Sequence, residues 1–348
     1  MSYRYSKPNL GDEALDAAVL ALVDQAGVQH DRDLVIQMLA SVLRMSTAGN
    51  ARGDMKMVER ILSDVGRSHA KFLPYREFRK CSVFGSARTQ PGTPNYKAAE
   101  ELGAALAEAQ WMVITGGGPG IMTAAVHGAG VENSFGVTIA LPFEPDDAGG
   151  LLPEDRLIRF RHFFTRKVTF MRESSAFVSF PGGFGTLDET FELLTLLQTG
   201  KETPCPVVLC EVEGGSYWTH WMNVVRDQLV TAGLVSPEDL DLVHISHDTT
   251  DALEYITGFF RVYHSTRWVG KRLIVRCQKA ITDAALDDLN ERFSEIVLTG
   301  SIERTETSPQ ELDDHDEVDL PRLAFHFDNR HFSRLHQLAQ ALNVAEIM

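Results

Sequence analysis

Residues 176–198 read AFVSFPGGFGTLDETFELLTLLQ, and this stretch decides the fold class. The continuous apolar run Ala176–Phe180 is typical of a strand that is buried on both faces of a parallel sheet. The glycine-rich segment Pro181–Gly185 follows at once, and Thr186–Gln198 has the composition of a helix. A strand, a loop of small residues and a helix in this order begin a β-α-β unit, whose ligands bind outside the carboxyl end of the strand.

The alternation of strands and helices continues on both sides, from about residue 80 to residue 265. Further strands are predicted at 81–85, 111–115, 135–141, 157–160 and 206–210, and helices at 96–110, 121–129, 165–174 and 217–232. Near-continuous apolar strands between helices are typical of a parallel sheet with helices on both faces. We therefore predict an α/β fold with a Rossmann-like, doubly wound parallel sheet.

Two further segments flank this core. Between Gly11 and Tyr75, apolar residues recur at helical spacing, which predicts two or three helices with starts at Asp12 and Asp31 and a stop at Gly49. After residue 270, strands are predicted at 272–277, 296–302 and 322–327, and helices at 283–293 and 332–342. This order suggests a small ferredoxin-like α+β module. The predicted domains are an N-terminal helical extension (1–78), a Rossmann-like core (79–268) and the C-terminal module (269–348).

Composition limits the classes of function. The chain has 348 residues, 44% of them hydrophobic, and a formal net charge of −15. Such an acidic chain is a poor binder of long nucleic acid, but local N–H groups and arginines still suit a small anion. No apolar run approaches the roughly 18 residues of a membrane span, and the first residues lack the apolar core of a signal peptide, so we expect a cytoplasmic protein without a membrane partner.

Two groups of residues suggest metal or disulfide chemistry, but each has a simpler explanation. The four cysteines form no CxxC pair, so buried free thiols are favoured over a disulfide framework or a zinc site. Residues 311–319 read ELDDHDEVD, which is more simply a solvated loop than a metal site.

Three loops of small residues follow predicted strands, namely Gly85–Ala87, Gly116–Gly120 and Pro181–Gly185. Glycines let backbone N–H groups approach an anion, and the dipole of the next helix attracts it. The spacing is not that of a dinucleotide fingerprint, a P-loop or a nucleophile elbow. This argues against a dehydrogenase, a P-loop nucleotide triphosphatase and an α/β-hydrolase.

Glu189 and the basic pair Arg166–Lys167 are the charged candidates for chemistry. Glu189 follows Thr186 by three residues, so the two also fit a capping box, with Thr186 as the helix cap. Arg166 and Lys167 also fit a solvated helix face. Spacing alone leaves these alternatives open.

Taken together, three motifs resemble those of the Lonely Guy (LOG) family of phosphoribohydrolases, known for releasing cytokinin bases from their riboside monophosphates. They are PGGFGTLDE (181–189), RKVTFM (166–171) and GGGPGIM (116–122). The resemblance covers roughly residues 80–211. The methionine of the second motif, Met171, stands one position later than in the common family spacing, so Met171 is not carried over as a ligand contact.

The resemblance implies hydrolysis of the N-glycosidic bond of a nucleoside 5′-monophosphate, AMP-like or a cytokinin riboside monophosphate, to free base and ribose 5-phosphate. It implies Arg166 and Glu189 as catalytic residues, no metal or redox cofactor, and a homodimer or higher homo-oligomer. The substrate- and phosphate-binding positions that it implies are Gly85, Ser86, Gly117, Gly118, Gly120, Lys167, Pro181, Gly182, Gly183, Gly185 and Thr186.

Two other identities compete with this interpretation. Related Rossmann-like proteins carry molybdenum cofactor or bind nucleotides without hydrolysing them, and such a protein would need no Arg166–Glu189 pair. Proteins with these motifs are often labelled lysine decarboxylases, but no lysine here stands in a recognisable pyridoxal phosphate context. The two flanking segments make the chain similar to the longer bacterial nucleosidases rather than to the short family members.

Overall fold

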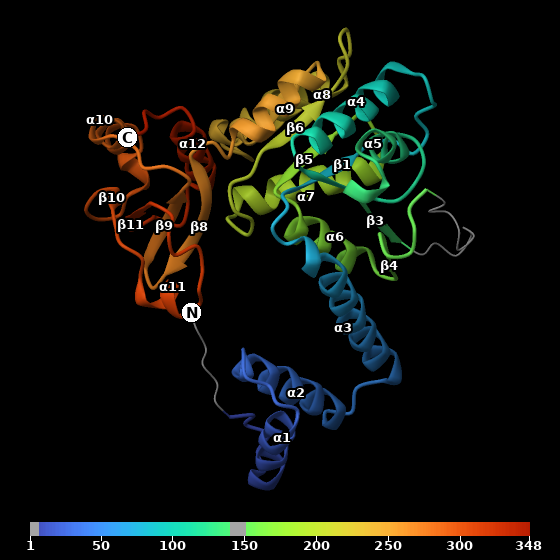
Figure 1. Cartoon of the computed structure of the whole chain (residues 1–348), viewed down its shortest axis with the longest axis vertical. Helices are drawn as coiled ribbons and strands as arrows, with labels where there is room; N and C mark the ends of the chain where they lie inside the picture. Colours follow the sequence, from blue (N-terminus) through green and yellow to red (C-terminus); the bar gives the residue numbers. More distant parts are fainter. Residues whose placement is uncertain (1–6, 140–150) are drawn as a thin grey trace. The chain divides into compact units, whose positions relative to one another are not determined.

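The computed structural model describes residues 7–139 and 151–348 and forms two compact units, Met1–Gly66 and Arg67–Met348 (Figure 1). In the first unit, α1 (Glu13–Gln25) and α2 (Arg32–Thr47) bury Val19, Val23, Ile36 and Ala40. α3 (Arg52–Phe72) begins in this unit and ends in the second, before the single turn η1 (Leu73–Tyr75). The predicted start at Asp12 is confirmed, because its carboxylate accepts hydrogen bonds from the N–H groups of Ala14 and Leu15.

The second unit is built on a seven-stranded sheet in which every neighbouring pair is parallel, with the order β4-β3-β2-β1-β5-β6-β7. The strands are β1 (Lys80–Phe84), β2 (Met112–Thr115), β3 (Ser134–Ile139), β4 (Leu157–Phe160), β5 (Ala176–Ser179), β6 (Val207–Cys210) and β7 (His244–Ser246). The chain moves outward from β1 to β4 and then returns to pair β5 with β1. The predicted Rossmann-like, doubly wound fold is confirmed, and its switch point lies between β1 and β5. The last two residues of the predicted strand 135–141 lie outside the described residues.

Helices cover both faces of the sheet (Figure 1). α4 (Pro94–Glu108), α5 (Ile121–Ala129) and α9 (Thr249–Gly258) pack on one face, and α6 (Phe163–Glu173) and α7 (Phe184–Gln198) on the other. Close packing of α4 on α5 needs glycine at position 128, because a Cβ there would lie 1.8 Å from the carbonyl oxygen of Glu100. The four cysteines are free and buried, as predicted.

The remaining turns of this core are short. η2 (Val131–Asn133) precedes β3, and η4 (Pro237–Leu242) precedes β7. The predicted helix 217–232 is interrupted: α8 (Tyr217–Val224) continues as the π-helical segment η3 (Val225–Val230). None of the helices that the structure describes combines the length and the apolar character needed to cross a membrane.

The C-terminal α+β module has a four-stranded antiparallel sheet of order β10-β11-β9-β8. Its elements are β8 (Tyr263–Val269), β9 (Arg272–Cys277), α10 (Asp283–Arg292), η5 (Ser294–Ile296), β10 (Glu303–Arg304), α11 (Pro309–Asp313), β11 (Arg322–Phe325) and α12 (Phe332–Leu342). α10 joins β9 to β10, and β11 lies between them, which is the split β-α-β unit of a ferredoxin-like module. The outer strand, β8, comes before β9 in the chain, whereas the fourth strand of a ferredoxin-like module follows the last helix. The predicted domain boundary between residues 268 and 269 falls inside β8.

The predicted strand at 296–302 is wrong. Ser294–Ile296 forms a 3-10 turn, Val297 makes a single bridge to Phe327, and the regular strand begins only at Glu303. The apolar pattern does not predict the structure here, because Gly300 has a φ of +77°, a left-handed conformation that interrupts a strand. Ile296 and Ile302 are nevertheless fully buried, so the apolar pattern reports packing rather than strand structure.

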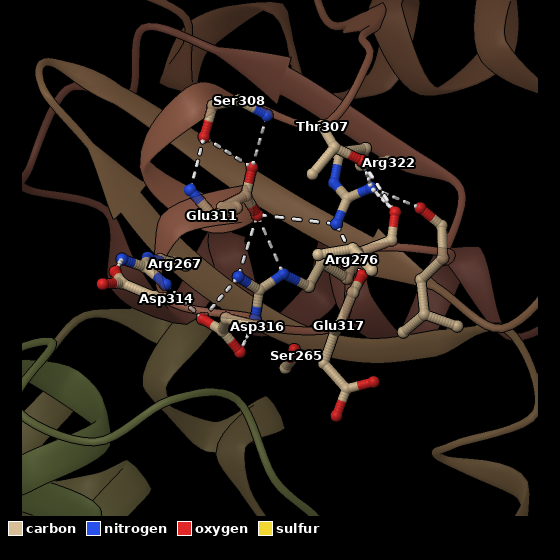
Figure 2. Close-up of polar contacts among 12 residues, drawn as sticks. Ser265, Arg267, Arg276, Thr307, Ser308, Glu311, Asp314, Asp316, Glu317 and Arg322 are labelled. Atoms are coloured by element: carbon tan, nitrogen blue, oxygen red, sulfur yellow. Dashed lines mark hydrogen bonds and ion pairs between the residues drawn. The ribbon is translucent and has the colours of Figure 1, made fainter.

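The prediction that residues 311–319 form a solvated loop is wrong for Glu311. This side chain is 0% exposed and accepts hydrogen bonds from Arg276 Nε (3.1 Å) and Nη2 (2.8 Å) and from Ser308 Oγ (2.9 Å; Figure 2). Asp316 accepts two more from Arg276, at 3.1 and 2.7 Å, and Arg322 Nη2 lies 3.6 Å from Glu311. Burial alone would raise the pKa of Glu311, but the hydrogen bonds from Arg276 and Ser308 outweigh it and lower this pKa.

Replacing Glu311 with alanine should destabilise the protein. Arg276 would keep its contact with Asp316, but the buried Arg322 would lose its carboxylate partner, and breaking a buried ion pair typically costs about 3–5 kcal/mol. The control is Asp288→Ala, which removes an exposed ion pair with Arg292 and should cost less than about 1 kcal/mol. Urea unfolding at neutral pH, followed by circular dichroism, measures both. Equal losses in the two variants would contradict a structural role for the buried network.

Candidate active site

A cleft of about 1020 Å³ opens at the switch point of the sheet. One wall follows β1 and consists of Gly85–Arg88, and the opposite wall follows β5 and consists of Pro181–Leu187. The two loops meet directly, because Ser86 N donates a hydrogen bond to the carbonyl of Pro181 over 3.2 Å. The cleft therefore lies where doubly wound sheets bind ligands.

The loop after β5 carries the start of α7 into the cleft. α7 begins at Phe184 with Gly183 as its cap, and no side chain caps it, so the predicted start at Thr186 and the capping box of Thr186 and Glu189 are wrong. Thr186 instead lies in the first turn. A Cβ at Gly182 would lie 2.2 Å from Thr186 Oγ1, so glycine is required for the loop to pack on the helix. The wall of the cleft is thus made of backbone and small side chains.

The loop Gly116–Gly120 plays a different part. Among the described residues of this loop, only Gly116 lines the cleft, whereas Gly117, Gly118 and Gly120 do not. Gly120 has a φ of +70°, and a Cβ there would lie 2.3 Å from the carbonyl oxygen of Ser86. Glycine at position 120 lets the second loop pack against the first, and the structure does not bring the three predicted binding positions to the cleft.

Arg166 and Glu189 meet at the cleft from α6 and α7. Arg166 Nη2 lies 3.2 Å from Glu189 Oε1, and both residues line the cleft. The Glu189 side chain is 4% exposed and that of Arg166 is 15% exposed, so the alternative of a solvated helix face is wrong for Arg166. Glu189 Oε2 and Arg166 Nε are buried and have no hydrogen-bond partner within residues 7–139 and 151–348. Such orphaned polar atoms at a cleft are typical of a site that a ligand completes.

Lys167 lies beside the Arg166–Glu189 pair but outside the cleft. Its side chain is 14% exposed and does not line the cleft, although the motif predicts a binding role. Lys167 Nζ is 2.9 Å from Asp188 Oδ2 and 3.8 Å from Glu189 Oε2, and it also forms a hydrogen bond with Glu192. Burial raises the pKa of Glu189 above its ordinary value, against the opposing effect of the positive charges on Lys167 and Arg166.

Other residues of the site were not predicted. Arg88 lines the cleft directly after the first loop, where its place behind Gly85–Ala87 could have signalled it. Phe163 and Phe170 supply apolar walls, and the Arg166 guanidinium lies 5.0 Å from the ring centre of Phe163. No group of acidic, histidine or cysteine side chains suited to a metal ion occurs in the part of the chain that the structure describes.

Comparison with known proteins gives relatives for this arrangement. The chain is 30% identical over 200 residues to the probable cytokinin riboside 5′-monophosphate phosphoribohydrolase LOGL3 of Oryza sativa subsp. japonica, covering 55% of this chain and 91% of that protein. It is 28% identical over 206 residues to the cytokinin riboside 5′-monophosphate phosphoribohydrolase LOG3 of Arabidopsis thaliana, covering 57% and 92%. The family model described as "Possible lysine decarboxylase" matches residues 120–256.

The chain belongs to the LOG family. Among solved structures, the molybdenum cofactor binding protein of Rippkaea orientalis is 21% identical, with a TM-score of 0.37, and the match covers 52% of this chain and 96% of that one. The matches to the LOG relatives leave about half of the chain uncovered, so the added segments of this LOG protein have no counterpart in them.

Proposed function

We propose that this LOG protein hydrolyses the N-glycosidic bond of nucleoside 5′-monophosphates to free base and ribose 5-phosphate. The observation that carries the proposal is the buried Arg166–Glu189 pair at a cleft walled by two small-residue loops. Cytokinin riboside monophosphates and AMP-like nucleotides are the proposed substrates, since the relatives are named for the former.

The loops suit the 5′-phosphate. Ser86, Gly183 and Gly185 line the cleft, and the first N–H groups of α7 have no partner within their own helix. Binding the phosphate there would fix the ribose relative to Glu189 and favour monophosphates over nucleosides, because remote binding energy positions the reacting bond.

The chemistry then needs a carboxylate beside C1′. As the C1′–N bond breaks, positive charge builds on the ribose, and the Glu189 carboxylate stabilises it. Water adds its oxygen to C1′, and the departing base takes up the water's proton, with Glu189 orienting that water. Arg166 holds Glu189 through the 3.2 Å contact and offers its remaining donors to the nucleotide.

Replacing Glu189 with glutamine should lower turnover about 100-fold or more, since the charge opposite the ribosyl cation is lost while the shape is kept. The control is Glu192→Gln, one turn further along α7 and outside the cleft, which should retain most activity. Chromatography of AMP, GMP, CMP, UMP and a cytokinin riboside monophosphate, incubated with each protein, measures free base and ribose 5-phosphate.

Intact nucleotide in every incubation, combined with tight binding, would contradict hydrolysis and leave a non-catalytic nucleotide- or cofactor-binding protein. Equal activity of wild type and Glu189→Gln would contradict the assigned role of Glu189.

As the pH is lowered, the activity should begin to fall at a pH above the ordinary pKa range of a carboxyl group. Burial raises the pKa of Glu189, so its charged form is lost as the pH falls through this raised pKa. Lys167→Met removes a cation that opposes the shift and should move the acid limb of kcat/KM to higher pH. The exposed Lys97→Met serves as the control. Identical acid limbs in all three proteins would exclude Glu189 as the titrating group.

We also propose that the chain forms a homodimer through α6 and α7. Phe163, Phe164 and Val168 of α6 are about half exposed and Phe184 of α7 is 92% exposed, and a monomer rarely leaves such apolar surface in water. Val168→Asp should convert the dimer to a monomer, whereas Leu234→Asp, at another exposed apolar position, should not. Sedimentation equilibrium measures the mass, and a wild-type mass of one chain would contradict the proposal.

A further inference from the structure

A second pocket, of about 440 Å³, lies at the opposite edge of the sheet from the cleft. It is lined by residues that precede the strands: Arg79 before β1, Ser174 and Ser175 before β5, and 201–205 before β6. β8 of the C-terminal module closes it with Tyr263–Ser265. We call it the amino-edge pocket. Its volume is within the range of small-molecule sites.

Three cations line the amino-edge pocket, where Glu202 is the single acidic residue of the lining. Arg79, Arg172 and Lys201 make no side-chain hydrogen bond or ion pair to any residue of the described ranges 7–139 and 151–348. Arg79 is only partly exposed, and its guanidinium lies 3.7 Å from the ring centre of Phe260, which fixes its plane. Three cations gathered beside one acidic residue repel one another, so the arrangement is suited to an anion.

Other arginines in the same unit do form ion pairs, in contrast to the three cations of the amino-edge pocket. Arg267 and Arg276 of the C-terminal module each contact two carboxylates (Figure 2). The chain has an excess of acidic residues, so carboxylate partners for arginine are abundant. The lining of the amino-edge pocket contains a single acidic residue, Glu202. Burial raises the pKa of its carboxyl group, while hydrogen bonds from Thr203 and the charge of Arg172 oppose this shift.

Residues with hydroxyl groups complete the site. Tyr263 lines the pocket and is fully buried, and its hydroxyl is hydrogen-bonded to Thr266 of its own strand. Ser175, Thr203 and Ser265 line the same space. Several O–H donors together with arginine and lysine match the oxygens of a phosphoryl group.

We propose that the amino-edge pocket binds the phosphoryl group of a small molecule, with Arg79, Arg172 and Lys201 as its cations and Tyr263 as a hydroxyl donor. This site is separate from the cleft of the proposed reaction, since no residue lines both. The proposal does not depend on hydrolysis of a nucleotide.

The test is isothermal titration calorimetry of the full chain with inorganic phosphate and with pyrophosphate. Arg79→Met and Lys201→Met should each weaken one binding component about 10-fold or more, as loss of a charge-assisted hydrogen bond does. Lys201 is exposed, so its replacement leaves the fold intact, and circular dichroism checks both variants. Arg79→Lys keeps the charge and should restore part of the affinity.

Arg88→Met is the matched control, because Arg88 lines the cleft instead. This variant should leave the component that depends on Arg79 and Lys201 unchanged. Wild-type protein that binds neither anion would overturn the proposal. So would a single binding component that Arg88→Met abolishes while Arg79→Met and Lys201→Met leave it intact.

Discussion

The pairing of β5 with β1 is the constraint on which the rest of the molecule depends. Cys81–Phe84 stands in register with Ala176–Ser179, so the two strands end together and their loops meet. Because the chain has wound outward to β4 before it returns, the helices that follow β1 and β5 lie on opposite faces of the sheet. The space between those loops is therefore available to a ligand, and the first turn of α7 enters it.

Burial of Glu189 has a cost that the surrounding charges only partly offset. Its pKa is raised by burial although Arg166 and Lys167 both stand close, and one carboxylate oxygen has no hydrogen-bond partner in the described chain. A residue selected only for stability would gain from a better partner or from an apolar replacement. The proposed reaction gives this cost a reason, since a ribosyl cation would supply the missing interaction.

Sequence patterns locate elements well where local and tertiary preferences agree. Residues 121–129, 157–160, 272–277 and 332–342 have the predicted limits, because apolar periodicity and flanking breakers coincide there. The failures have physical causes. α7 starts before Thr186 because Gly183 caps it without a side chain, and the acidic run at 311–319 contains a buried residue because two arginines from the paired strands β9 and β11 reach Glu311. The motifs also could not separate the glycines that line the cleft from Gly120, which faces Ser86. Only the fold brings the second loop against the first.

Net charge is a weak guide to what individual sites bind. The chain has a formal charge of −15, yet it gathers Arg79, Arg172 and Lys201 around one space and Arg88 and Arg166 around another. This is possible because a few cations close to an anion interact with it more strongly than many screened carboxylates on distant surfaces do. α6 contributes to both spaces, with Arg166 near its start and Arg172 near its end. One helix thus presents a cation to each of the two spaces, although the chain as a whole is acidic.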